Sequence, residues 1–465
     1  MNFYERYAEW FRRILPSPFT IAVLLSIFTF FLALFFTLPA EKNYFQYSLN
    51  LLSFWEKGLW TSGLLVFAVQ MMLMLVLGHV LALTKPVNQL IGKATKYCTN
   101  TSNAAFLVSL LTIIVAYFNW GLGLIFGAIF ARKVAENAQK NNFEINYPLI
   151  GASGYVGLMV WHGGFSGSAL AKVAEPGHLK TIVQQSNLSN AQISLLPESI
   201  NYGLTVFSLM NIVAAIACLI IIPSVMFWVG KKLKPTKIEL TQEKQLFQKP
   251  MEKLIGAEKL DHSKSLALYF GLVILGGVIA KIFLIDKGGF LGFFTPNNIN
   301  FLLLGLGILL HGNFNNFLKA VDSAISGVSG ILIQFPLYFG IMGIMNNSGL
   351  INDVSSFFVS ISTQTTFPIF TFLSAGLVNF FVPSGGGQWA IQGPLIVNAA
   401  LEIGVPLNKA ILALAYGDQL TNMLQPFWAL PLLGITGLKA KDILPYTLIL
   451  FVVGFVIFIS ALLIF

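Results

Sequence analysis

The stretch Asn379-Phe-Phe-Val-Pro-Ser-Gly-Gly-Gly-Gln-Trp-Ala-Ile-Gln-Gly-Pro394 decides the fold of this chain. The apolar segments on its two sides, about 13 and about 15 residues long, fall short of the ~20 residues that a helix needs to cross a bilayer. Pro383 lacks an amide hydrogen, and the glycines at 385–387 favour irregular backbone. The stretch therefore predicts a helical hairpin over 366–402 that enters the membrane, turns at 384–387 and leaves by the same side.

The turn of this hairpin has the properties of a small anion site. Irregular backbone at membrane depth survives only where it is buried in protein or lines a wet cavity. The second arm is expected to start at Gln388, so that its free amide groups and positive dipole end point at the turn. A glycine-rich loop outside the membrane is the alternative. Such loops usually carry charge, whereas no charged residue lies between Asp353 and Glu402.

The composition of the chain indicates an all-α polytopic membrane protein. Of its 465 residues 56% are hydrophobic and only 10% are charged, and the mean hydropathy is +0.75. The net charge of +9 reflects Lys and Arg in cytoplasmic loops rather than a nucleic-acid partner. Cys98 and Cys218 lie far apart without metal-ligand spacing, so neither a disulfide framework nor a zinc site is expected, and no cofactor is implied.

Hydropathy and charge together predict about nine spans and their orientation. The expected spans are 19–38, 61–84, 147–176, 200–229, 265–285, 299–318, 330–350, 406–436 and 445–465. A second pair of arms, 104–118 and 122–134, is too short to span separately. The segment 230–264 holds nine Lys against five acids, which places it and the N-terminus in the cytoplasm. This assignment fits the remaining loops only if the hairpins 104–134 and 366–402 are both re-entrant.

The same pattern indicates an inverted internal repeat. Asn119 and Asn379 precede the two hairpin turns, and a span that begins with a proline and is broken part-way follows each hairpin, at 147–176 and 406–436. The repeats are predicted over 1–229 and 286–465, separated by the basic loop 230–264 and a linking span at 265–285. Opposed hairpins and broken spans in inverted repeats are typical of secondary transporters, whose binding site lies at the bilayer midplane.

Four breaks in the helices, at 119–123, 161–168, 384–388 and 418–425, should converge on this site. The breaks contain hydroxyls, amides, an imidazole and a carboxylate but no Lys or Arg, which favours a small monoanion over a polyanion. The candidate substrate-binding residues are Asn119, Gly121, Gly123, His162, Gly163, Ser166, Ser168, Asn379, Ser384, Gly385, Gly386, Gly387, Gln388, Gln392, Thr421 and Asn422.

Asp418 and His162 are the candidates for ion coupling. A carboxylate within a broken membrane helix is energetically costly and usually functional. If protons drive transport, one of the two groups must change its protonation during the cycle. If sodium drives transport, Asp418 would stay ionised and act as an oxygen ligand, although no metal site is assigned. A lone membrane histidine also occurs as a plain packing residue, so His162 keeps that alternative.

Other classes of function fit the residues less well. Gly164-Phe-Ser-Gly167 has the form of a short serine-protease motif, but a catalytic serine also needs a base such as His79 or His311 within reach. We therefore expect no enzyme. A passive channel would need a continuous polar lining, which opposed hairpins do not predict. A C4-dicarboxylate carrier is the nearest alternative, and it would favour a cationic side chain or two separated polar clusters.

Four segments resemble the bacterial short-chain fatty acid transporter family (AtoE-like proteins). They are the hallmark 381–394, the segments 160–168 and 416–422, and the N-terminal 13–19. The resemblance extends over the whole chain and implies uptake of short-chain carboxylates, such as acetoacetate or butyrate, across the bacterial inner membrane. The family is grouped with the ion transporter superfamily. That grouping implies an elevator-like movement of 85–176 and 352–437 against the remaining spans, and a homodimer formed through those spans.

Overall fold

The computed structural model describes residues 16–183, 196–235, 256–285 and 295–465, together with residues 6, 9, 10, 13, 193, 240 and 293. In these residues the chain is helical, without β-strands. The fold class expected from the sequence, an all-α polytopic membrane protein, is thereby confirmed. Much of the chain before residue 16 and of the basic loop 230–264 lies outside the described residues.

The principal helices, in chain order, are α2 (Pro18–Phe36), α3 (Tyr44–Leu59), α4 (Ser62–Ala82), α5 (Lys85–Thr95), α6 (Thr101–Phe118), α7 (Trp120–Lys140), α8 (Tyr147–Tyr155), α9 (Ser168–Val173), α10 (His178–Ile182), α12 (Leu209–Lys232), α13 (Glu258–Asp261), α14 (Lys264–Ala280), α16 (Pro296–His311), α17 (Phe314–Ala324), α18 (Ser329–Asn347), α19 (Leu350–Ser360), α20 (Phe367–Phe381), α21 (Gly385–Ile403), α22 (Leu407–Thr421), α23 (Pro426–Thr436) and α24 (Ala440–Ile464).

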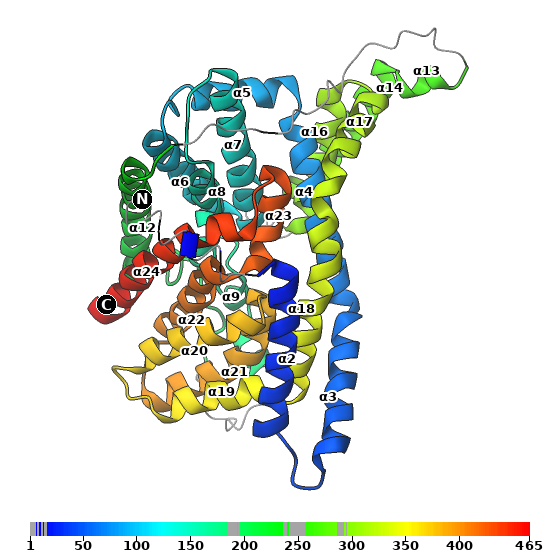
Figure 1. Cartoon of the computed structure of the whole chain (residues 1–465). Coiled ribbons are helices and arrows are strands. Elements are labelled where there is room, and N and C mark those ends of the chain that lie inside the picture. The colour runs from blue at the N-terminus through cyan, green and yellow to red at the C-terminus, as the bar shows by residue number, and fades with distance from the viewer. Residues whose placement is uncertain are drawn as a thin grey trace.

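Helices α2, α3, α4, α16, α17 and α18 form a column along one side of the molecule (Figure 1). Within it α18 packs on α2 and α3, and α4 packs on α16. Small residues bring α3 and α18 together, because a Cβ at Gly58 would lie 2.4 Å from the carbonyl oxygen of Phe339 and 3.0 Å from Cα of Gly343. Membrane helices associate through such close backbone approach, since lipid supplies no hydrophobic drive.

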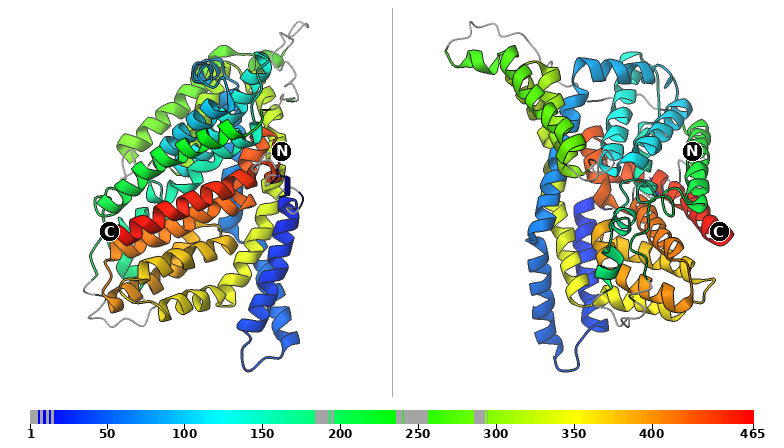
Figure 2. Two further views of the ribbon diagram at one scale, coloured as in Figure 1. Left: turned by 60° about the vertical axis from the view of Figure 1, so that its left-hand side comes forward. Right: turned by 180° about the vertical axis from the view of Figure 1, so that it is seen from behind.

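Two groups of helices lie beside the column at opposite ends of the molecule. Figures 1 and 2 show α6, α7 and α8 toward one end and α19, α20, α21 and α22 toward the other. Helix α6 packs on α7 and α20 packs on α22, while α12 packs on α6 and α24 packs on α12, α8 and α22. The resemblance placed the spans at 200–229 and 445–465 with the immobile part, whereas their helices α12 and α24 pack against the hairpin groups.

The first hairpin is longer than the sequence led us to expect. The Asn100 side chain accepts a hydrogen bond from the Asn103 amide, so α6 begins at Thr101 and has 18 residues. Its length and composition are sufficient to cross a membrane, and the expectation of two short arms at 104–118 and 122–134 is wrong. The turn is the single residue Asn119, which ends α6 and caps α7.

The second hairpin turns three residues earlier than expected. Helix α21 begins at Gly385 rather than Gln388, because the Ser384 hydroxyl accepts a hydrogen bond from the Gly387 amide and caps the helix there. The turn is therefore Val382-Pro383-Ser384, and the three glycines form the first turn of α21. The helix end still points into the middle of the molecule, as the hairpin prediction requires.

Seven helices of the described residues are long and apolar enough to cross a membrane, at Pro18–Phe36, Ser62–Ala82, Thr101–Phe118, Leu209–Lys232, Lys264–Ile285, Phe314–Asn347 and Ala440–Ile464. The expected nine included the two broken segments and a span at 299–318, whose helix α16 has 16 residues. The exact number of spans, the re-entrant hairpins, the inverted repeat and the sidedness stay predictions.

Candidate functional site

Both broken segments lose their regular helix in the middle of the molecule. In the first, α8 is followed by 3-10 turns at Val156–Met159 and Trp161–Gly163, and α9 begins at Ser168. Gly164 lies against the end of α6, where a Cβ would be 2.4 Å from the Tyr117 carbonyl oxygen. In the second, α22 passes into a 3-10 turn at Asn422–Leu424 before α23 begins at Pro426. Pro426 occupies the first turn of α23, where its missing N–H costs no hydrogen bond.

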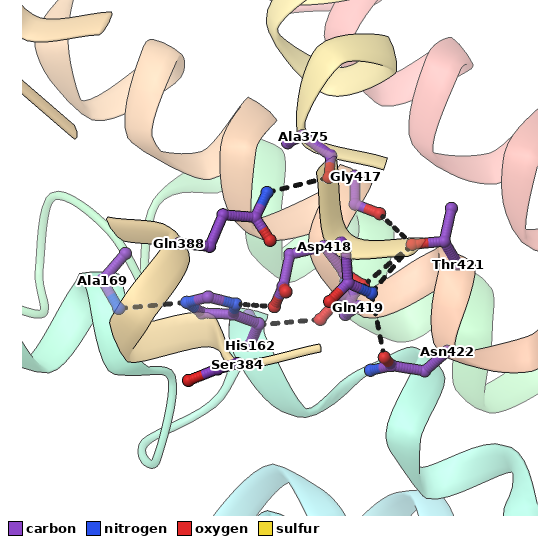
Figure 3. A network of polar contacts seen from close by, with 12 residues as sticks. His162, Ala169, Ala375, Ser384, Gln388, Gly417, Asp418, Gln419, Thr421 and Asn422 are labelled. Atoms are coloured by element: carbon purple, nitrogen blue, oxygen red, sulfur yellow. Dashed lines mark hydrogen bonds and ion pairs between the residues drawn. The ribbon is translucent and has the colours of Figure 1, made fainter. Parts of the chain in front are cut away.

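His162 and Asp418 join the two breaks directly (Figure 3). His162 Nδ1 is hydrogen-bonded to Asp418 Oδ2, and the side chains are 0% and 1% exposed. The Ala169 backbone N–H donates to His162 Nε2 at 3.0 Å. Because Nε2 accepts this bond, the imidazole hydrogen lies on Nδ1 and is donated to the carboxylate. These two hydrogen bonds fix the orientation of the imidazole, which in turn orients Asp418.

Three polar residues that the sequence analysis did not select hold this pair in place. The Gly163 N–H donates to Gln419 Oε1 at 3.0 Å. Asn211 Nδ2 donates to the Gly163 carbonyl at 2.8 Å, and the Tyr416 hydroxyl donates to Asn211 Oδ1 at 3.0 Å. All three side chains are buried. One sequence feature could have identified these residues: each is polar and lies inside an apolar helix. Burying such a side chain costs free energy unless it is hydrogen-bonded.

Asn379, near the end of α20, is hydrogen-bonded to several residues of the second break. Its Nδ2 donates to the Asp418 carbonyl at 2.7 Å, to Thr421 Oγ1 at 2.9 Å and to Asn422 Oδ1 at 3.0 Å. Asn422 Nδ2 in turn donates to the Leu158 carbonyl of the first broken segment at 3.2 Å. The structure therefore brings Asn379, Thr421 and Asn422 together and links them to the first broken segment.

The tip of the second hairpin lies against the His162–Asp418 pair. A Cβ at Gly385 would be 2.7 Å from Cη2 of Trp161, 2.9 Å from Cε1 of His162 and 3.2 Å from Oδ2 of Asp418. A Cβ at Gly386 would meet only Ser168, at 3.9 Å. Of these two glycines, Gly385 is the one whose backbone closely approaches the pair.

Two glutamines of α21 hold the hairpin itself. Gln388 Nε2 donates to the Ala375 carbonyl at 2.8 Å and to Gln392 Oε1 at 2.7 Å. Gln392 Nε2 donates to Ser355 Oγ at 2.8 Å and Ser374 Oγ at 3.1 Å. These contacts join α19, α20 and α21, and they place Gln392 within the hairpin rather than at the breaks.

The tip of the first hairpin reaches the first break through Ser166. The Trp120 N–H donates to Ser166 Oγ at 3.0 Å, and Asn119 Oδ1 accepts from the Leu122 amide. Gly123 packs on Ala116 of α6, and Gly121 faces a methionine of α4, so these glycines serve helix packing. Of the two bases considered for the serine-protease motif, His79 and His311, the latter is hydrogen-bonded through Nε2 to the Val80 carbonyl, whereas Ser166 Oγ accepts from the Trp120 N–H.

A second contact fastens the segment after the first broken span to α21. Trp389 Nε1 donates to His178 Nε2 at 3.0 Å, and their rings are stacked with centroids 6.3 Å apart. Burial lowers the pKa of His178 below its usual 6.5, while Glu175 raises it and Lys172 lowers it further. His178 accepts this bond only when it is neutral, so the contact depends on pH.

The site residues are packed against one another, and two hollows lie elsewhere. One of about 410 Å³ is lined by apolar residues of α2, α3 and α18. The other, of about 620 Å³, lies between α5, α6 and α7 and is bordered by Lys93 and Lys96. The His162 and Asp418 side chains are buried from solvent in this conformation.

A family model described as "Short chain fatty acid transporter" matches residues 3–465. Two curated proteins, each named "Putative short-chain fatty acid transporter", are 35% identical to the chain. The Escherichia coli protein is matched over 96% of this chain and 97% of its own length, and the Haemophilus influenzae protein over 93% and 92%.

Among solved structures, the crystal structure of the YdaH transporter of Alcanivorax borkumensis is 13% identical, with a TM-score of 0.43 over 97% of each chain. The sequence matches, which cover nearly the whole length of the chain, decide its classification. The protein is thus a multi-pass membrane protein that belongs to the short-chain fatty acid transporter family.

Proposed function

We propose that this protein takes up short-chain monocarboxylates such as acetoacetate or butyrate across the bacterial inner membrane, with its N-terminus in the cytoplasm. A proton or sodium gradient drives the uptake, and the proton is favoured. The names of the curated relatives support the substrate class. The observation that carries the coupling is the buried His162–Asp418 pair, which joins both broken segments beneath the tip of the second hairpin.

An anion in this site would be bound by neutral hydrogen-bond donors and not by a cationic side chain. The first turn of α21 presents its N-terminal end to the break at 161–168, with Gly385 against Trp161 and Gly386 facing Ser168. A helix N-terminus with nearby hydroxyls suits one carboxylate. A second carboxylate would find no Lys or Arg among the residues of the described breaks, so we prefer a monocarboxylate over a C4-dicarboxylate.

The position of Asp418 gives a physical reason for symport. A substrate carboxylate at the start of α21 would lie beside Asp418, because a Cβ at Gly385 would be 3.2 Å from Asp418 Oδ2. Two negative charges at such a separation repel strongly in a site with little water. A proton or a sodium ion on Asp418 removes the repulsion, so substrate and cation bind together more readily than either binds alone.

The hydrogen bonds of His162 favour Asp418 as the group that receives the proton. A second proton on the imidazole would displace the Ala169 N–H from Nε2, whereas the carboxylate accepts a proton without losing a backbone partner. Sodium is the alternative, with Asp418 as an oxygen ligand. Amide oxygens of Asn379 and Gln388 are buried without a hydrogen-bond partner in the described part of the chain, and in that case they would supply further oxygen ligands.

An elevator-type movement would carry the site across the membrane. In this proposal the hairpin groups move with α12 and α24 against the column, and the column forms the contact of a homodimer in the bilayer. The packing of α12 on α6 and of α24 on α8 and α22 supports treating these helices as one unit. The experiment below does not depend on this movement.

Uptake of labelled butyrate into proteoliposomes tests the function. An inward proton gradient is expected to concentrate butyrate inside the vesicles, and unlabelled acetoacetate is expected to compete more strongly than succinate. Vesicles without protein measure passive entry of the protonated acid and provide the baseline. Uptake driven by sodium alone, with the membrane potential clamped and a protonophore present, would show that sodium and not the proton is the coupling ion. Competition by succinate but not by acetoacetate would show that the protein is a dicarboxylate carrier.

A further inference from the structure

Trp161 has a buried polar group that the site described above does not use. Its side chain is 5% exposed, and its indole Nε1–H has no hydrogen-bond partner among the residues that the structure describes. A buried indole N–H usually finds an acceptor, because leaving it unpaired costs its full desolvation. The unpaired donor therefore indicates an acceptor that the chain itself does not supply.

The surroundings of Trp161 place this donor in the transport site. Its ring stacks on His162 with centroids 4.5 Å apart at 21°, and it lies directly beneath Gly385 at the tip of the second hairpin. Trp55 also has a buried indole N–H without a partner in the part of the chain that the structure describes, but it lies on α3 in the column, beside the apolar hollow. Trp161 is thus distinguished by its contact with the proposed coupling pair and with the mobile tip.

On its other side Trp161 faces a cluster of aromatic rings. Trp120 lies 6.0 Å from Trp161, Trp428 lies 5.2 Å from Trp120, and Phe67 lies 5.9 Å from Trp428, between ring centroids. Phe335 lies 6.2 Å from Phe67. The cluster joins α4 and α18 of the column to α7 and α23, so it lies where the hairpin groups meet the column.

We infer that the Trp161 indole N–H donates to the carboxylate of the substrate and that the aromatic cluster receives its alkyl chain. This inference rests on the proposed function and assigns the parts of that site. A carboxylate is the acceptor of matching charge, and a bond to it is stronger than one between neutral groups. Close-packed rings beside the donor suit a chain of a few carbons and would exclude a longer chain by overlap. A second carboxylate pressed against these rings would lose its hydration without gaining a donor.

The donor is tested by Trp161→Phe, which removes the N–H and keeps an aromatic ring. Butyrate binding to purified protein in lipid nanodiscs is measured by titration calorimetry, together with the melting temperature. We expect the Kd of Trp161→Phe to rise about ten- to a hundredfold, which corresponds to the loss of a hydrogen bond to a charged group. Trp55→Phe removes an equally buried, unpaired N–H from the column and is expected to bind butyrate as the wild type does.

The chain-binding part is tested by Trp428→Ala, which removes one ring of the cluster. It is expected to shift the ratio of hexanoate to butyrate affinity toward hexanoate, while Trp161→Phe weakens both acids alike. Equal Kd values for Trp161→Phe and the wild type would overturn the donor role. If Trp161→Phe does not fold, an unchanged hexanoate-to-butyrate ratio in Trp428→Ala overturns the inference. Wild-type protein that binds neither acid would instead refute the proposed function.

Discussion

Alanine at Gly385 tests whether the second hairpin must close onto the His162–Asp418 pair. The added Cβ would meet Trp161 at 2.7 Å, His162 at 2.9 Å and Asp418 at 3.2 Å, whereas carbon atoms in contact normally lie about 3.5–4.0 Å apart. Gly386, the next residue in the same helical turn, provides a matched control because its Cβ would meet only Ser168, at 3.9 Å. Neither glycine has a positive φ, so alanine fits the backbone at both positions.

The expected magnitude follows from these contacts. Both substitutions gain at most ~1 kcal/mol of helix propensity, and this gain cancels in the comparison. The overlap at Gly385 costs about 1–3 kcal/mol, as in other overpacked sites. The cost falls on the closed arrangement, because a displaced hairpin tip leaves room for the methyl group. The population of the closed arrangement should therefore fall about 5- to 150-fold relative to Gly386→Ala.

Counterflow exchange of labelled butyrate in proteoliposomes is the appropriate assay, since in the proposed mechanism every exchange cycle requires the tip to close. We expect Gly385→Ala to exchange at least fivefold more slowly than Gly386→Ala, with both proteins inserted in similar amounts and melting at similar temperatures. Equal exchange rates would show that the hairpin tip does not close onto this pair during transport. A loss of exchange in Gly386→Ala but not in Gly385→Ala would show that Gly386 is the residue that must be free of a side chain.

Three further predictions concern coupling, topology and pH. Asp418→Asn should lose uptake driven by the ion gradient and keep exchange of labelled butyrate, and retained concentrative uptake would remove Asp418 from coupling. On a cysteine-free background, cysteines at Gly121 and Gly386 should be labelled from the cytoplasm and the periplasm respectively, whereas labelling of both from one side would disprove the inverted repeat. The Trp389–His178 hydrogen bond requires neutral His178, whose pKa is lowered by burial. Its contribution is complete above the ordinary histidine pKa of about 6.5 and is lost as the pH falls below it. Between pH 7.5 and 5.5 the wild type should lose on the order of 1 °C more in melting temperature than His178→Gln, and an equal loss would assign the contact no role in stability.

The sequence located the helix breaks but not the residues at which the hairpin helices begin. Short capping side chains decide where a helix begins, and Asn100 and Ser384 each moved a helix start by three residues. Their capping bonds depend on local backbone geometry, which hydropathy does not encode. The sequence also treated Gly385, Gly386 and Gly387 alike, and only the structure shows that Gly385 makes the close approach. Residues such as Asn211 were missed because their partners lie on other helices, far away in the sequence.

The sequence by itself determined that the chain is a helical membrane protein interrupted at glycine- and proline-containing segments. It determined this because hydropathy and missing N–H groups act along a single segment. It also supplied the family, through motifs at 160–168, 381–394 and 416–422. Only the tertiary structure decided that His162 binds Asp418 and that Asn379 joins α20 to the end of α22. Only the structure shows, too, that the Trp161 N–H has no hydrogen-bond partner among the described residues. Such contacts join residues that lie far apart in the sequence. They form only when the helices that carry them pack together, so no single segment predicts them.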